Sequence, residues 1–180
     1  DVVLGDFPNK AYAIIPPRSS ERSLGLLVVF PEPGELDRAK TKAYWSDFCH
    51  DYGWIVAVIN SGDPRSWSRE EIGLAGRVIG RLSNNYQLDK SRTVIAGLGV
   101  GGRVALAAAL MENKRVSGAM TVGTDLARLG WPTQNSPMQS IDFLLIGEMK
   151  NLEPVAESLS NKGYAAHVQA TGGLEIGKWE

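Results

Sequence analysis

The sequence of 180 residues contains one cysteine, two histidines and nearly equal numbers of positive and negative side chains. The single cysteine, Cys49, excludes an internal disulfide and a cysteine-based metal site, and two histidines are too few to make a zinc site expected. Lys and Arg together number 19 against 20 Asp and Glu, and no basic run is present that could neutralise a row of phosphates. We therefore expect no metal, no cofactor and no nucleic-acid partner.

Long apolar runs are also absent. None approaches the length of about 20 residues that spans a bilayer, and the first residues show no signal-peptide pattern. Membrane insertion is therefore not expected, and the compartment stays undetermined. With 43% hydrophobic residues, the chain is expected to form one soluble domain over residues 1–180. It begins at Asp1 without a methionine, which is compatible with excision from a larger chain.

Seven short apolar segments bounded by Gly, Pro, Asn or Asp predict β-strands. They are Ala11–Ile15, Leu24–Phe30, Trp54–Ile59, Thr93–Ala96, Val116–Val122, Phe143–Ile146 and Tyr164–Val168. Helical patterns lie between them, with apolar residues at Tyr44–Tyr52, Ile72–Leu82, Val104–Met111 and Val155–Leu159. This alternation predicts an α/β fold with a doubly wound, mostly parallel sheet of about seven strands and helices on both faces.

Capping residues in the sequence also predict where the first helix starts and ends and where the second helix starts. The first helix should start near Asp37, bury an aromatic face and end at Gly53 as a C-cap. Ser68 and Glu71 match a capping box at the start of the second helix. The segment 123–140 is too polar and proline-broken for a long element, so we expect a surface excursion there.

A glycine-rich segment joins the fourth predicted strand to the third predicted helix. Residues 94–106 read VIAGLGVGGRVAL, so a strand turns through glycines into a helix of small residues. This segment resembles the nucleophile elbow of α/β hydrolases, whose pattern is Gly-x-Ser-x-Gly. Gly99 stands at the nucleophile position. If the elbow is conserved in shape, Gly99 should have a positive φ, which is inexpensive for glycine.

The resemblance to the α/β-hydrolase superfamily, particularly to small esterases and dienelactone-hydrolase-like proteins, extends over residues 11–173. Residues 24–34 resemble the strand and loop that carry part of the oxyanion hole, with Pro31-Glu32 where His-Gly is usual. Residues 143–151 resemble the strand that ends in Gly-x-x-Asp, and Lys150 stands at the acid position. Residues 170–174 resemble the loop that ends in the catalytic histidine, and Leu174 stands at that position.

The resemblance therefore implies a lost catalytic triad. A serine hydroxyl needs a histidine base to take its proton and a carboxylate to orient that base, and Gly99, Lys150 and Leu174 supply none of these groups. A shift of one residue would bring Asn151 or Glu175 into the acid or base position. We expect a non-catalytic, esterase-like pseudoenzyme domain that acts as a binding or interaction module of a larger protein. The enzyme alternative is an esterase-like or peptidase-like hydrolase that uses other residues.

A protein partner or small ligand would be expected at the carboxyl ends of the strands. The loops there hold four candidate ligand-binding residues: Trp67, Trp131, Asp125 and Glu148. They also hold Asn60, Asp63, Arg65 and Trp179. Tryptophan and arginine are enriched at interface hot spots, although tryptophans that simply cover the sheet ends would give the same pattern.

A dinucleotide-binding alternative rests on the same glycines. Gly97, Gly99 and Gly102 match Gly-x-Gly-x-x-Gly between a strand and a helix, and Asp125 follows the next strand as a candidate ribose ligand. This pattern is typical of NAD(P)-binding Rossmann-like domains, but the spacing to Asp125 is long. The glycines would also be explained by a tight turn and close helix packing alone.

The remaining titratable side chains indicate structural roles. Cys49, His50 and Asp51 are consecutive on a predicted helix, where neighbours point about 100° apart and cannot converge on one substrate atom. Cys49 is therefore expected to pack in the core. His167 lies on a predicted strand and is expected to be a structural histidine.

Overall fold

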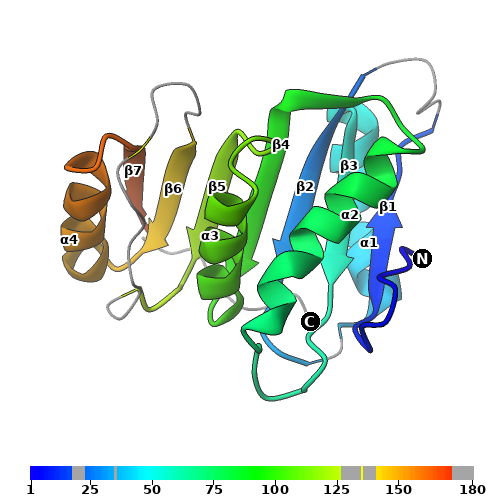
Figure 1. The fold of residues 1–180 in the computed structure, drawn as a ribbon, viewed down its shortest axis with the longest axis horizontal. Helices are drawn as coiled ribbons and strands as arrows, with labels where there is room; N and C mark the ends of the chain where they lie inside the picture. The colour runs from blue at the N-terminus through cyan, green and yellow to red at the C-terminus, as the bar shows by residue number, and fades with distance from the viewer. Residues whose placement is uncertain (18–22, 35, 127–134, 136–140, 172–180) are drawn as a thin grey trace.

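The computed structural model of the chain describes residues 1–17, 23–34, 36–126, 135 and 141–171. Within them, strands and helices alternate as the sequence predicts (Figure 1). The strands are β1 (Ala11–Ile14), β2 (Leu24–Phe30), β3 (Trp54–Ile59), β4 (Leu88–Leu98), β5 (Gly118–Val122), β6 (Asp142–Gly147) and β7 (Ala165–Ala170). The helices are α1 (Arg38–Tyr52), the short 3-10 helix η1 (Glu70–Gly73), α2 (Leu74–Ser83), α3 (Gly101–Met111) and α4 (Met149–Ser160).

All seven strands form one sheet in the order β1-β3-β2-β4-β5-β6-β7. β1 is antiparallel to β3, and all the other neighbouring pairs are parallel. The predicted fold class, a doubly wound and mostly parallel sheet of seven strands, is confirmed. β2 leads through α1 to β3 on one side, whereas β4 leads through α3 to β5 on the other. The carboxyl ends of β2 and β4 therefore meet at a topological switch point, where open α/β sheets bind their ligands.

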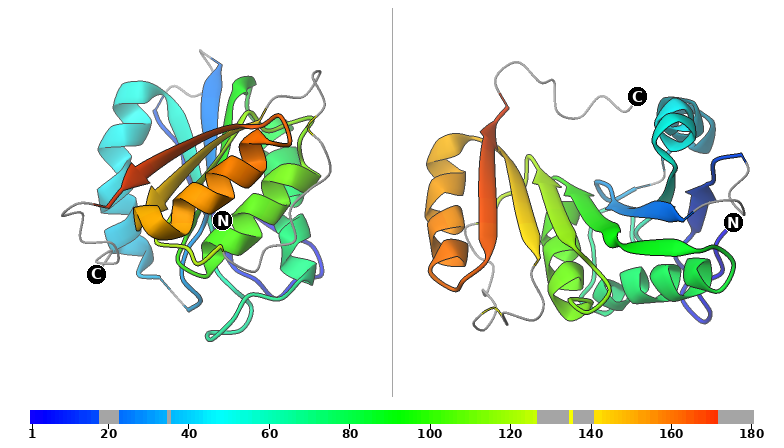
Figure 2. Two further views of the ribbon diagram at one scale, coloured as in Figure 1. Left: turned by 90° about the vertical axis from the view of Figure 1, so that its left-hand side faces the viewer. Right: turned by 90° about the horizontal axis from the view of Figure 1, so that it is seen from above.

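Helices cover both faces of the sheet. Helices α2, α3 and α4 lie on one face and α1 lies on the other (Figures 1 and 2). The larger core cluster lies under α2, α3 and α4 and includes Phe30, Leu106 and Phe143, which are each 0% exposed. A smaller cluster lies under α1 and includes Cys49 and Val58. Because side chains alternate along a strand, β3 contributes Ile55, Ala57 and Ile59 to the first cluster and Val56 and Val58 to the second.

Helix α1 has the predicted position but not the predicted burial. Asp37 caps its N-terminus through a side-chain oxygen, and Gly53 ends it with φ 65°, as expected. The expected aromatic face is only partly in the core, since Tyr44 and Tyr52 are each 65% exposed. The residues of α1 that are buried are Thr41 and Cys49. The helical period placed the aromatics on one face, but only part of that face meets the sheet.

Residues 68–83 also differ in detail from the prediction. The 3-10 helix η1 starts at Glu70, with Arg69 as its N-cap and no side-chain capping bond, and α2 follows directly at Leu74. Only half of the predicted capping box forms, in which the carboxylate of Glu71 accepts from the backbone N–H of Ser68. Glu71 is buried, with only 4% of its surface exposed, whereas a capping residue usually lies at the surface. Its carboxylate also contacts the side chain of Asn9, which is distant in sequence.

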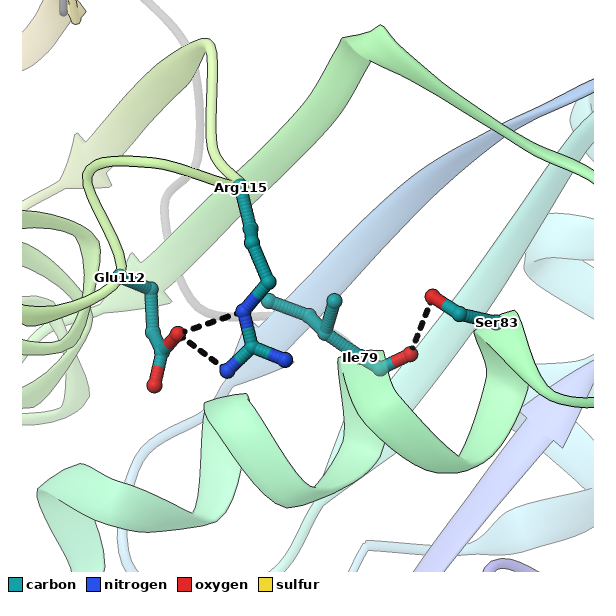
Figure 3. Close-up of polar contacts among 4 residues, drawn as sticks. All are labelled: Ile79, Ser83, Glu112 and Arg115. Carbon is teal, nitrogen blue, oxygen red and sulfur yellow. Dashed lines mark hydrogen bonds and ion pairs between the residues drawn. The ribbon is translucent and has the colours of Figure 1, made fainter.

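A charged pair at the end of α3 lies against α2. Arg115 donates to the carboxylate of Glu112, including from Nε at 2.9 Å, and the pair lies beside α2 (Figure 3). A Cβ on Gly76 of α2 would lie 2.1 Å from Glu112 Oε1, so the glycine lets the pair approach the helix backbone. At the last residue of α2, Ser83 Oγ donates to the carbonyl of Ile79, one turn earlier in the helix, at 2.7 Å (Figure 3).

In the described part of the chain, no helix is long and apolar enough to cross a membrane.

Candidate functional site

The turn between β4 and α3 has the shape that the sequence predicts. Gly99 has φ 49°, in the left-handed region, so the predicted positive φ is confirmed. Its N–H donates to the carbonyl of Val122 at 2.8 Å, and its own carbonyl accepts from Gly102 at 3.2 Å. These bonds join the turn both to β5 and to the first turn of α3. The chain thus passes from strand to helix within two residues.

The neighbouring glycines are required by close packing. A Cβ on Gly101 would lie 2.2 Å from the carbonyl oxygen of Phe30 and 2.3 Å from that of Pro31. A Cβ on Gly97 would lie 2.5 Å from the carbonyl oxygen of Gly101. These contacts are with backbone atoms, which cannot rotate away. Packing of α3 against the end of β2 therefore accounts for Gly101, and packing of β4 against the start of α3 accounts for Gly97.

The carboxylate of Glu32 lies over Gly99. A Cβ on Gly99 would lie 1.4 Å from Glu32 Oε1, so the glutamate occupies the space into which a side chain at residue 99 would project. The other oxygen, Oε2, accepts from the N–H of Val100 at 3.3 Å. In α/β hydrolases the N–H that follows the nucleophile contributes to the oxyanion hole. Glu32 therefore lies against both Gly99, whose position resembles that of the nucleophile, and the N–H that follows it.

Trp67 holds the loop that carries Glu32. Its indole N–H donates to the carbonyl of Pro31 at 3.0 Å, and its ring meets Phe30 edge-on with 5.2 Å between the ring centroids. Trp67 was a candidate ligand-binding residue, but its side chain is partly buried and its polar group is engaged within the protein. The contacts indicate a structural role in positioning Pro31 and Glu32.

A buried polar network lies beneath this loop. Glu71 accepts from the side chain of Asn9, from the N–H of Gly62 at 2.7 Å and from the N–H of Ser68. Asn9 also donates to the carbonyl of Asn60 at 3.0 Å. The network ties the loop that holds Trp67 to the N-terminal segment. Sequence analysis identified Glu71 only as a capping residue, and nothing in the local pattern indicates its contact with Asn9.

The other candidate residues do not converge on the elbow as a triad would. Asp125 accepts from Arg103 through its carbonyl at 2.7 Å and through Oδ2 at 2.9 Å. Lys150 lies in the first turn of α4 and pairs with Glu148 at 3.1 Å, and both side chains are more than half exposed. Asn151 donates to the same carboxylate at 3.2 Å. The positions Trp131, Leu174, Glu175 and Trp179 lie outside the described residues.

Neither cysteine nor histidine chemistry is favoured by the geometry. Cys49 is 1% exposed, and burial raises the pKa of its thiol to about 11, so it packs in the core as predicted. His50 contacts Asp51 on the exposed side of α1, and His167 is exposed on β7. The described residues include no group of three or more His, Cys, Asp or Glu side chains that could hold a metal ion.

The strand order and the elbow after β4 define an α/β-hydrolase fold. No family model and no curated protein matches the chain. Solved structures match well: a thermostable esterase has a TM-score of 0.67 at 14% identity, over 90% of this chain and 50% of that one. A ferulic acid esterase has a TM-score of 0.67 at 12% identity, over 94% of this chain and 88% of that one.

A third solved structure extends the comparison. It is a dienelactone hydrolase-like promiscuous phosphotriesterase from metagenomic libraries, with a TM-score of 0.60 at 13% identity, and the match covers 90% of this chain and 81% of that one. This chain spans half the length of the thermostable esterase. At such identities the comparisons establish the fold, and the chemistry has to be argued from the site.

Proposed function

We propose that this domain has an α/β-hydrolase fold without hydrolase activity and serves as a binding module. The observation that carries the proposal is the carboxylate of Glu32 over Gly99, where an active hydrolase would place its nucleophile. A glycine has no side chain to attack a carbonyl carbon. The group in its place belongs to another loop and contacts the N–H of Val100.

The surroundings of the elbow support the same proposal. Activation of a nucleophile needs a base within hydrogen-bond reach and a group that orients this base. At the position that resembles the catalytic acid, Lys150 supplies a cation that pairs with Glu148. Among the described residues, the two histidines lie on the outer side of α1 and on β7, and neither contacts Glu32. An esterase or peptidase activity would need residues other than these.

Activity is tested directly with an activated ester. We expect the purified domain to show no turnover above a heat-inactivated control, because no described group at the elbow can act as an activated nucleophile. Gly99→Ser should also be inactive, because Lys150 is paired with Glu148 and neither histidine lies beside the elbow to take the proton of the new hydroxyl. Turnover that persists through repurification and disappears on substitution of Glu32 would favour a hydrolase that uses this carboxylate and would overturn the proposal.

The dinucleotide alternative has a separate test. A pyrophosphate would have to approach the backbone at Gly99, the second glycine of the pattern, but the carboxylate of Glu32 occupies the space over that residue. Its negative charge would repel a second anion at the same place. We therefore expect no rise in the melting temperature with NAD or NADP, whereas a ligand of the native state would raise it by mass action. A rise that depends on dinucleotide concentration would restore the alternative.

A further inference from the structure

The edge strand β1 leaves part of its backbone open. It is the first strand in the sheet order, and among the described strands it pairs with β3 alone (Figure 1). Lys10, directly before β1, accepts from the N–H of Asn60 at 2.9 Å. Backbone groups of alternate residues in an antiparallel pair point in opposite directions, so Ala11 and Ala13 direct theirs away from β3. The carbonyl of Ala11 accepts from the N–H of Val2 at 2.8 Å, whereas no described backbone group bonds to Ala13 on that side.

Two hollows in the surface flank this open edge. One lies beside α1 and has a volume of about 270 Å³, and the other lies beside α2 and has a volume of about 170 Å³. Ala13 and Ile15 line both hollows, so the open backbone lies between them. The hollow beside α2 is partly apolar, since Leu82 and Tyr86 contribute to it. Because successive side chains of an extended segment point to opposite faces, a segment added to this edge would place alternate side chains in the two hollows.

The N-terminal residues show which side chains fit on each side of the edge. Val2, which bonds to Ala11, packs in the core cluster on the side of α2. The preceding residue, Asp1, faces the other way and pairs with Arg38 of α1 at 2.6 Å. The guanidinium of Arg38 in turn lies 5.2 Å from the centroid of the Tyr12 ring. An apolar side chain toward α2 and an acidic side chain toward α1 are therefore the pattern that this edge accommodates.

Further cations lie along the open part of the edge. Lys42, four residues after Arg38, lines the hollow beside α1 and pairs with no described acidic side chain. Four residues advance a helix by about 6 Å, and alternate residues of a strand are about 6.6–6.8 Å apart. An acidic side chain two strand positions beyond that of Asp1 would therefore meet Lys42. Arg81 is exposed at the hollow beside α2.

Charge favours a partner protein over a second copy of this chain. Among the described residues that line the two hollows, the acidic one is Asp1, and it is already paired. Two copies joined at this edge would bring Lys42 and Arg81 of each toward those of the other, and like charges across a strand pair are destabilising. A segment with acidic side chains would instead neutralise these cations.

We propose that the open edge of β1 at Ala13 and Ile15 binds an extended segment of a partner protein in which acidic and apolar side chains alternate. The backbone of the segment bonds to that of Ala13, the acidic side chains face Lys42, and the apolar side chains enter the hollow beside α2. Pro16 ends the edge, because proline has no N–H to donate. The inference rests on the proposed binding role, to which it adds a surface and a class of partner, and it does not depend on the loss of hydrolase activity.

The test titrates an isotope-labelled domain with a hexapeptide of alternating glutamate and valine, acetylated and amidated at its ends, at constant ionic strength. We expect saturable NMR shifts at the amides of Ala13 and Ile15 and slower hydrogen exchange at Ala13, whose N–H becomes bonded. The same peptide with all its amides N-methylated keeps its charges but has no N–H groups, and it should not bind. Replacement of the glutamates with lysine should also abolish binding.

Three variants test the two kinds of contact. Lys42→Glu should weaken binding by about threefold to tenfold, in keeping with the modest energy of an exposed charge pair. Lys40→Glu makes the same change in charge on α1 outside the hollow and should bind like the unmodified domain. Ala13→Pro removes the outward N–H without removing a bond to β3, so it should abolish the shift at Ile15 if the variant melts cooperatively.

Each contrary outcome overturns a stated part of the proposal. Absence of a saturable shift, or equal binding of the N-methylated peptide, would exclude strand addition. Equal affinity of Lys42→Glu and Lys40→Glu would exclude the choice of an acidic partner. A domain that is dimeric without peptide and monomeric as Ala13→Pro would show that a second copy occupies the edge. Ester turnover would contradict the loss of hydrolase activity and leave peptide binding untouched, so the two proposals can fail separately.

Discussion

Replacing Gly101 with alanine is expected to lower the free energy of unfolding by about 3 kcal/mol or more, one of the largest effects of any single change in the elbow. The new Cβ would lie 2.2 Å from the carbonyl oxygen of Phe30 and 2.3 Å from that of Pro31. Both oxygens belong to the backbone at the end of β2, where Trp67 holds the chain. Relief would require α3 to move away from the sheet and give up contacts in the core.

Urea unfolding followed by circular dichroism measures this change, and Gly73→Ala is the matched control. Nothing lies within 4 Å of a Cβ at Gly73, and its φ is −70°. The control should therefore be neutral or stabilised by up to about 1 kcal/mol, since alanine is the better helix former. If Gly101→Ala unfolds at the same urea concentration as the unmodified domain, the inferred close contact between Gly101 and the end of β2 would be wrong.

Glu71→Gln is expected to destabilise the domain by about 3 kcal/mol, although the substitution hardly changes the size of the side chain. The carboxylate accepts from Asn9, from Gly62 and from Ser68, and a glutamine has only one oxygen to offer them. Its amide group would place a donor against at least one of these donors. The residue is 4% exposed, so water cannot easily replace the lost acceptor.

Glu153→Gln on the exposed side of α4 makes the same chemical change without burial and should leave the unfolding curve unchanged. Glu71→Gln should also loosen the loop that carries Trp67, which can be followed by the fluorescence of its indole. Equal stability of the two variants would show that the buried network contributes nothing to the folded state.

Prediction from sequence was most successful for the strands and for the elbow. Each strand is a local pattern of apolar residues between turn residues, and such a pattern survives folding because one or both faces of the strand become buried. The positive φ at Gly99 was predictable for the same reason, since a strand that turns at once into a helix requires an unusual backbone conformation. Burial along α1 was less predictable, because it depends on how much of the helix the sheet reaches.

Contacts between distant segments were beyond sequence analysis. Trp67 was a candidate for ligand binding, yet its indole N–H is engaged with Pro31. Glu32 was visible as a departure from the usual His-Gly pair, but its position over Gly99 depends on the register of β2 beside β4. The open backbone edge of β1 likewise depends on the strand order, which places this strand at one end of the sheet.

The amino-acid sequence by itself determined the order and type of the elements, the parallel sheet and the absence of a nucleophile at residue 99, because these follow from local patterns and residue identity. Tertiary structure alone decided which group lies over Gly99. Glu32 reaches Gly99 because parallel strands bring their carboxyl ends to one edge of the sheet. Glu71 is buried because the N-terminal segment packs beside it and the side chain of Asn9, 62 residues earlier in the chain, donates to its carboxylate. Both outcomes depend on side chains that meet only after the sheet has formed.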